Sequence, residues 1–249
     1  SGHSLNGVAI DTTNHRLFVS DFFNNRVLVF NLNASDVLTD YTADAVLGQD
    51  DFVTGVAGSP NSLFCLNSPR GLVYDDANDR LFVSMTGQVS VFDVSTIVDG
   101  EEATNRLCAL QEDLETPGDY YCMAWGGSTN DFGVAEDLAY DSTRQYLFVT
   151  DSSTNRVLVF DVNDIVDGEN AINVIGQEDF ISTAAATDVD GLSTPRGVTY
   201  DESTDYLYVA DYSNNRVMIF NMVAVDDGED AINVLGQDDF VTCDSGRTQ

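Results

Sequence analysis

The chain contains four copies of one sequence unit, and this internal repetition restricts its fold more than any other feature. The first copy opens with GVAID at residues 7–11 and closes with VLGQDDF at residues 46–52. The last copy opens with GVTYD at residues 197–201 and closes with VLGQDDF at residues 234–240. The four copies begin at Gly7, Gly71, Asp137 and Gly197, so the period is 60 to 66 residues.

Each copy carries four short runs rich in Val, Ile, Leu, Phe and Tyr, separated by clusters of Asp, Asn, Gly and Ser. Such runs are typical of strands joined by turns. A four-stranded meander cannot bury both faces alone, so neighbouring copies must stack. We therefore predict an all-β fold, a β-propeller of four blades, each a four-stranded antiparallel meander. We expect one domain over residues 1–249, with blades at approximately 5–66, 67–134, 135–194 and 195–249.

The repeated motifs resemble the NHL repeat. The resemblance is carried by residues 69–75, 149–160 and 195–220, which contain Pro-Arg-Gly, an Asp-ended strand, Asn-Arg-Val and a closing Phe. It implies a propeller, usually of five or six blades, with the GVAID strand innermost and the VLGQ strand outermost. With four copies, either the ring closes by packing of the fourth blade on the first, or the chain is an excerpt of a longer one.

Charge excludes several classes of partner. The chain has 42 acidic and 10 basic residues, a net charge of −32, and all ten basic residues are Arg. Such a surface repels the phosphates of nucleic acids and anionic lipids. No apolar stretch approaches the roughly 18 residues of a membrane span, so we expect neither nucleic-acid binding nor membrane insertion.

Three explanations of the acidic composition remain open: a high-salt environment, a cation-binding surface and a low-pH habitat. The acids are dispersed over the turns of every copy, which favours the first. We expect no resident cofactor, and Ca²⁺ only as a bridge at acidic surfaces.

The cysteines have irregular spacings with no CxxC, and the chain has only two His, which argues against zinc. Their even number fits two disulfides in an oxidising compartment, with buried free thiols as the alternative. We expect pairing within one copy first, and the other pair by elimination. The expected pairs are Cys108 with Cys122 and Cys65 with Cys243.

An Asp that ends the second strand and an Arg that opens the third recur in three copies. In the second copy Met85 and Gln88 stand at these places, so both charges are lost together. Joint loss indicates that the two side chains engage each other or the same turn, a structural role. The pairs are Asp21 with Arg26, Asp151 with Arg156, and Asp211 with Arg216.

The position before the innermost strand differs between copies and is expected at the mouth of the central channel. Its two arginines could hold a carboxylate or phosphate-like ligand. Alternatively, the acidic residue pairs with both arginines in a local ring of ion pairs. The four residues are Asn6, Arg70, Glu136 and Arg196.

Residues 115–134 are the least repeat-like segment, an irregular connection that holds Tyr120, Tyr121 and the only Trp, Trp125. Aromatic residues on such a loop often mark a contact surface. They could equally form a small satellite core pinned by Cys122. Both readings stay open.

Catalytic motifs do not converge in this sequence. There is no GxSxG elbow, P-loop or GxGxxG, and both histidines lie in the first copy. Residues 161–169 superficially resemble a calcium loop, but we expect a solvated turn there, as at residues 99–101 and 227–229.

We therefore expect a non-catalytic, extracellular or cell-surface scaffold for protein interaction or self-assembly, as an oligomer or fibre. The alternative is a metal-dependent hydrolase or lyase that uses Glu136 and Asp137.

Overall fold

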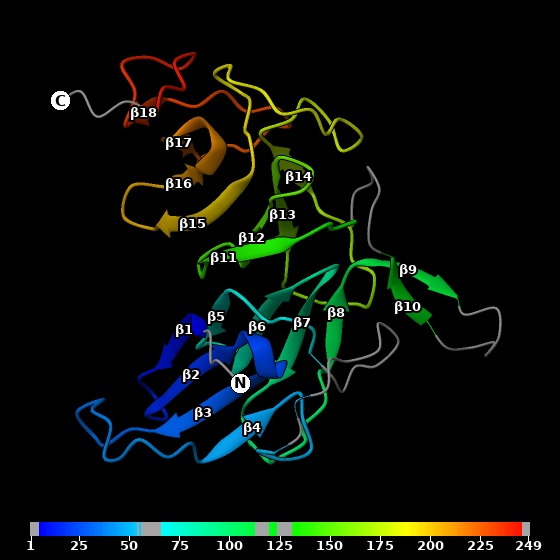
Figure 1. The fold of residues 1–249 in the computed structure, drawn as a ribbon, viewed down its shortest axis with the longest axis vertical. Coiled ribbons are helices and arrows are strands. Elements are labelled where there is room, and N and C mark those ends of the chain that lie inside the picture. Colours follow the sequence, from blue (N-terminus) through cyan, green and yellow to red (C-terminus); the bar gives the residue numbers. More distant parts are fainter. Residues whose placement is uncertain (1–4, 54, 56–65, 113–119, 124–130, 246–249) are drawn as a thin grey trace.

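The computed structural model describes residues 5–53, 55, 66–112, 120–123 and 131–245, and gives only the backbone of residues 5, 109–112 and 120–123. Its main elements are four four-stranded antiparallel sheets, the four blades (Figure 1). Blade 1 contains β1 (Leu5–Asp11), β2 (Arg16–Asp21), β3 (Arg26–Asn31) and β4 (Ala45–Leu47). Blade 2 contains β5 (Leu72–Asp75), β6 (Arg80–Met85), β7 (Gln88–Asp93) and β8 (Asn105–Leu107). Blade 3 contains β11 (Ala135–Asp141), β12 (Tyr146–Asp151), β13 (Arg156–Asp161) and β14 (Asn173–Ile175). Blade 4 contains β15 (Pro195–Asp201), β16 (Tyr206–Asp211), β17 (Arg216–Asn221) and β18 (Asn233–Leu235).

Within each blade the strands follow one another in chain order, as in a meander. The first strands lie innermost, where β1 contacts β5 and β11 contacts both β5 and β15. The short fourth strands lie at the outer edge of the blades. The all-β fold of four four-stranded blades predicted from the sequence is therefore confirmed.

The turns between strands are fixed by their polar side chains. In the first hairpin the Asp11 carboxylate accepts the backbone N–H groups of Thr13 and Asn14 at 3.0 and 2.8 Å. In two blades the second turn is a 3₁₀ helix, η1 (Phe22–Asn24) or η2 (Tyr212–Asn214). Each ends at an Asn in the left-handed region, which Asn adopts more readily than most residues.

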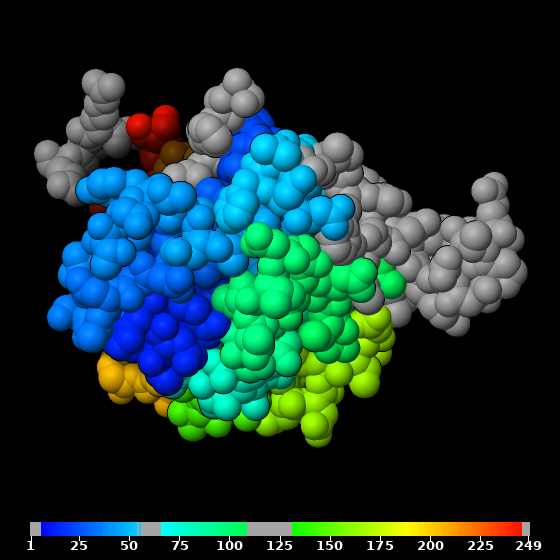
Figure 2. Space-filling view, turned by 90° about the horizontal axis from the view of Figure 1, so that it is seen from below, coloured from blue at the N-terminus to red at the C-terminus, as the bar shows by residue number. Residues whose placement is uncertain are grey.

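Neighbouring blades pack face to face through apolar side chains. We call the face of a blade that packs on the preceding blade its N-side face, and the opposite face its C-side face. Three clusters of buried residues fill the junctions between blades 1 and 2, 2 and 3, and 3 and 4. They contain, in that order, Phe18 and Val29 with Leu81 and Phe92, Phe82 and Val91 with Leu147 and Phe160, and Phe148 and Val159 with Leu207 and Phe220. Figure 2 shows blade 1, in blue, packed against blade 2, in cyan and green.

The fourth junction, between blade 4 and blade 1, is open. Of the core clusters among the described residues, none combines side chains of these two blades. In Figure 1 the four blades follow one another along an arc with β15–β18 at one end and β1–β4 at the other. The expected closure of the ring by packing of blade 4 on blade 1 is therefore not found. Residues at the junction, described below, account for this.

The connection after blade 2 also differs from expectation. It was predicted as an irregular loop, but β9 (Ala109–Glu112) and β10 (Tyr120–Met123) form an antiparallel hairpin apart from the four blades. The Pro117-Gly118 pair in the sequence between them is a turn signal that the prediction did not use.

In the described parts of the chain, no helix has the length and apolar character needed to cross a membrane.

Candidate functional site

The Asp–Arg pairs are buried inside three blades. Arg26 lies 3.0 Å from Asp21, Arg216 lies 2.7 Å from Asp211, and Arg156 lies 3.8 Å from Asp151. Burial lowers the pKa of Arg156, an effect that the charges of Asp151 and Asp131 oppose.

Each arginine of these pairs also fastens the outer turn of its own blade. Arg26 donates to the carbonyl of Phe52 and Arg156 to that of Phe180, at 2.5 and 2.6 Å. Arg216 donates in the same way to Phe240. Copy 2 has no Phe at this place, because Cys108 and residues 109–112 replace the GQDDF block. The charged pair and its target are thus absent from copy 2 together.

In the structure, the two arginines expected at the channel mouth contact different partners. Arg70 makes an ion pair with Glu136 at 3.1 Å and lies 5.0 Å from the ring centre of Phe22. Arg196 instead lies 3.8 Å from the ring centre of Tyr212. Asn6 is an exposed residue of β1. The two arginines therefore have separate partners, and the ion pair involves only one of them.

The acid next to this mouth, Asp137, serves the packing of blades. Its carboxylate accepts the N–H of Val198 in blade 4 at 3.1 Å. Burial raises the pKa of Asp137, hydrogen bonds from Val198 and Leu138 partly offset this, and the charge of Glu136 adds to it. Among the described residues, no three His, Cys, Asp or Glu side chains are grouped so that they could hold a metal ion.

The innermost strands of all four blades surround an axial cavity of about 340 Å³. Its wall combines aliphatic side chains with tyrosine residues from three blades. Two of the hydroxyls are engaged at their own hairpins, Tyr74 with Asp79 at 2.8 Å and Tyr200 with Asp205 at 2.7 Å. This cavity offers little chemistry for catalysis.

Three kinds of hydrogen bond recur across the closed junctions. The first comes from a Ser or Thr of the second strand, whose hydroxyl bonds the carbonyl before the next blade's innermost strand. Ser20 bonds Arg70 at 2.8 Å, Ser84 bonds Glu136 at 3.2 Å, and Thr150 bonds Arg196 at 3.3 Å.

The second comes from an Asp-Gly turn that binds the outermost strand of the preceding blade. The carboxylates of Asp99, Asp167 and Asp227 each accept a backbone N–H at 3.0 Å, from Val46, Arg106 and Val174 respectively. The N–H of the following glycine donates back to the same residue of the preceding blade. These turns are exposed to solvent, as expected, and they also join the blades.

The third kind of hydrogen bond comes from an arginine at the first hairpin of each of the first three blades. Arg16 pairs with Asp11 and donates to the carbonyl of Val94 in blade 2. Arg80 donates to Val162 of blade 3 at 2.8 Å. Arg144 reaches blade 4, where it bonds the hydroxyl of Tyr200 at 2.9 Å and the carboxylate of Asp205 at 2.7 Å.

At the fourth junction the sequence lacks all three of these side-chain contributions. Blade 4 has Ala210 at the Ser or Thr position. At the two hairpin positions that supply Arg16, Arg80 or Arg144 in the other blades, it has Tyr206 and Thr204. Blade 1 has no Asp-Gly pair between β3 and β4. The hydrogen bonds that join the other blades therefore cannot form between blade 4 and blade 1, which explains why the ring is open.

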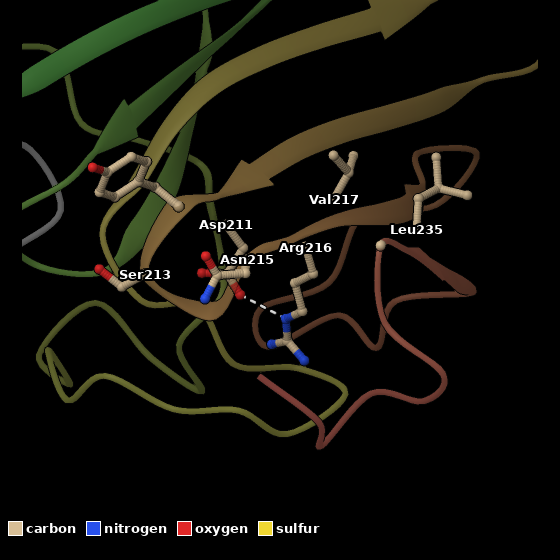
Figure 3. Close-up of a pocket in the computed structure, with 8 residues that line it drawn as sticks. Asp211, Ser213, Asn215, Arg216, Val217 and Leu235 are labelled. Atoms are coloured by element: carbon tan, nitrogen blue, oxygen red, sulfur yellow. Dashed lines mark hydrogen bonds and ion pairs between the residues drawn. The ribbon is translucent and has the colours of Figure 1, made fainter. Parts of the chain in front are cut away.

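The open C-side face of blade 4 carries the largest pocket described, of about 650 Å³ (Figure 3). Tyr212, Val217 and Leu235 line it together with the Asp211–Arg216 pair. The backbone N–H of Val234 in its outer strand donates to the side-chain oxygen of the neighbouring Asn233 at 2.8 Å. In blades 1 and 3 the corresponding N–H groups, of Val46 and Val174, instead donate to an Asp of the next blade. Sequence reasoning missed this site, although Ala210 and Thr204, which replace a hydroxyl and an arginine of the closed junctions, mark it.

Several predicted residues are not placed by the structure. Trp125 and Cys65 lie outside the described residues, and the side chains of Tyr120, Tyr121 and Cys122 are not described. Their expected roles in partner binding stay predictions.

The expected Cys65–Cys243 disulfide is not formed, because Cys243 is a free, exposed thiol. It lies beyond β18 on blade 4, which does not pack on blade 1. Cys108 is buried and disulfide-bonded, and its partner lies among the side chains outside the described set. Its pairing with Cys122 therefore stays a prediction.

Comparison with protein-family models supports the repeat assignment in one part of the chain. Residues 192–220, which include β15, β16 and most of β17, match the model of the NHL repeat, which confirms the predicted resemblance in this part of the chain. A search of curated proteins gave no match. Among solved structures, the chain is similar to one described as a nidogen/laminin complex, with 12% identity, a TM-score of 0.42, and coverage of 96% of this chain and 82% of that chain.

Proposed function

We propose that this chain, which carries an NHL repeat within four propeller blades, is a non-catalytic, extracellular scaffold that binds protein chains through the faces of its end blades. One observation carries the proposal. Both end faces retain the apolar residues that bury each internal junction, and Val8 and Leu235 at their edges are 66% and 50% exposed, whereas their counterparts at the closed junctions are buried. Exposed apolar patches of this kind mark protein interaction sites.

The channel mouth is a secondary contact surface in this proposal. Arg70, Glu136 and Arg196 bring charged and planar groups to one rim, and such groups are frequent in protein interfaces. The aromatic residues Tyr121 and Trp125 are proposed as further contact residues on the evidence of the sequence. The disulfide at Cys108 supports the extracellular assignment, since disulfides persist in oxidising compartments.

A hydrolase or lyase reaction has less support. Glu136 is bound by Arg70 at 3.1 Å and by the hydroxyl of Ser152 at 3.3 Å, so its carboxylate serves the packing of the rim. Asp137 binds a backbone N–H of blade 4. A metal at the axis would have to displace these contacts.

Selection from a displayed peptide library tests the proposal. The wild-type chain is immobilised, and the selected clones are then bound to three variants. The double variant Val8→Asp/Leu235→Asp places a charge on both end faces, and Val166→Asp makes the same change on an exposed turn of blade 3. We expect the clones to lose binding to the double variant and to keep it with Val166→Asp. Clones that bind all three equally would show that the end faces are not the binding surface.

The enzymatic alternative has its own test, turnover of lactone, phosphoester and glycoside substrates in millimolar Ca²⁺. We expect no turnover above that of a Glu136→Gln/Asp137→Asn variant. Turnover that the double variant abolishes would establish the alternative.

A further inference from the structure

We propose that the two open faces bind each other between copies of this chain, so that blade 4 of one copy packs on blade 1 of the next. This inference rests on the proposed scaffold function and names its partner as a second copy. The contact would be head to tail, because two different faces take part. Such contacts add copies at both ends and build open chains unless a ring closes.

The N-side face of blade 1 carries the complete pattern of a docked blade. Val8 occupies the position of Leu72, Leu138 and Val198, which are 6%, 5% and 8% exposed at the closed junctions. Val8 itself is 66% exposed. The same face continues with other apolar residues, as it does in the docked blades. These are Ile10, Leu17, Val19, Leu28 and Phe30.

The C-side face of blade 4 is equally complete. Leu235 is 50% exposed, whereas Leu47, Leu107 and Ile175 at the same position are fully buried under the following blade. Val217 and Ile219 continue this face, and the pocket beside Tyr212 is open to receive side chains (Figure 3). At each closed junction the occupant of this face is the N-side face of another blade. The chain itself supplies one such unoccupied face, at blade 1.

The missing hydrogen bonds determine the strength of this contact. Blade 1 offers no Asp-Gly turn for β18, and Ala210 and Tyr206 offer neither the hydroxyl nor the guanidinium of the closed junctions. The contact would therefore depend on apolar burial alone, and we expect it to be reversible and weaker than the contacts within a chain.

The net charge of the chain determines how the association between copies depends on salt. Each copy has a net charge of −32, so copies repel one another over the Debye length, which is about 10 Å at 0.1 M salt and about 3 Å at 1 M. Salt should therefore strengthen the association. A basic protein partner bound to the same acidic chain would be weakened by salt instead.

The experiment uses sedimentation equilibrium of the whole chain at low salt and at about 1 M NaCl. We expect the wild type to form dimers and longer chains at high salt. Val8→Asp and Leu235→Asp should each raise the dissociation constant at least tenfold, whereas Val166→Asp should behave as the wild type.

A mixture of the two face variants gives the decisive result. Val8→Asp keeps the C-side face of blade 4 intact, and Leu235→Asp keeps the N-side face of blade 1 intact. A head-to-tail contact therefore predicts that the mixture forms dimers and nothing larger, although each variant alone is monomeric. Dimerisation also shows that both variants are folded.

Three results would overturn the proposal: a wild type that stays monomeric at high salt, association that Leu235→Asp leaves unchanged, or a mixture that stays monomeric. A monomeric wild type whose selected peptide clones still depend on the end faces would leave the scaffold function standing and remove only the self-association.

Discussion

The hydroxyl of Ser20 lies 2.8 Å from the carbonyl oxygen of Arg70, and this bond joins blade 1 to blade 2. The same hydroxyl receives the N–H of Gly7 at 2.7 Å, so one side chain ties two innermost strands. Ser84 and Thr150 repeat the arrangement at the next two junctions. In blade 4 the position is Ala210, where the series of closed junctions ends.

Removal of one of these hydroxyls should weaken the fold. Ser84 is fully buried and its hydroxyl bonds both the N–H of Gly71 and the carbonyl of Glu136, so Ser84→Ala removes two buried hydrogen bonds. We expect a loss of about 1–3 kcal/mol in the free energy of unfolding, measured by urea denaturation. The exposed Ser35→Ala serves as control and should cost less than about 0.5 kcal/mol. Equal stabilities would show that the hydroxyl does not hold the junction.

The buried Asp211–Arg216 pair should behave as a unit. Asp211→Met alone leaves the Arg216 guanidinium buried without its carboxylate, and we expect it to cost about 3–5 kcal/mol. The double variant Asp211→Met/Arg216→Gln copies the pair Met85 and Gln88 of blade 2 and should cost less than the two single changes added together. Thermal unfolding of the three variants checks this. Simple additivity would mean that the two charges act independently.

The buried carboxyl of Asp137 should make stability depend on pH. Because its pKa is raised in the folded chain, chiefly by burial, the folded state holds this proton more tightly than the unfolded state does. Its favourable contribution is complete below the ordinary pKa of 3.8 and is lost as the pH rises through the raised value. Asp137→Asn keeps an oxygen acceptor for Val198 and removes the titration.

Melting temperatures measured from acidic to neutral pH give the comparison. The difference between Asp137→Asn and the wild type should shift in favour of the variant as the pH rises above about 4, and then level off. Asp164→Asn, the same change at an exposed site, serves as the control. A difference for Asp137→Asn that does not change with pH would refute the assignment.

Calcium should promote association more than sodium does at equal ionic strength, because a divalent cation can bridge carboxylates exposed on two copies. Light scattering in CaCl₂ and in NaCl solutions of matched ionic strength measures this. We expect a larger mean mass in CaCl₂, reversed by EDTA. Identical masses would show that calcium acts only by screening charge.

The sequence predicts most of the fold because its repeats are plain. The alternation of apolar residues, as in Arg16–Asp21, identifies the strands, and polar turns such as residues 11–15 identify the hairpins. Stacking of blades follows because a single sheet leaves two apolar faces. The Asp–Arg pairs were found by comparing copies, where Met85 and Gln88 are the informative exception.

The open fourth junction could not be predicted from the strand pattern. Val8 and Leu235 have the same apolar character as their buried counterparts, so their own residue type does not indicate exposure. The relevant signals are Ala210 and Thr204, which become meaningful only when the contacts of Ser20 and Arg144 across a junction are known. The disulfide between Cys65 and Cys243 was inferred by elimination, with no geometry behind it.

The open junction between blades 4 and 1 is tested most directly by electron–electron double resonance in a Cys243→Ser background, with dilute protein at low salt so that only distances within one molecule contribute. Spin labels at Glu178 and Val223 span the closed junction of blades 3 and 4, and labels at Asp238 and Asn33 span the fourth junction at corresponding places. We predict that the distance between Asp238 and Asn33 is clearly the longer. Two equal distances would mean that the four blades close into a ring and would remove the end faces on which the proposed function depends.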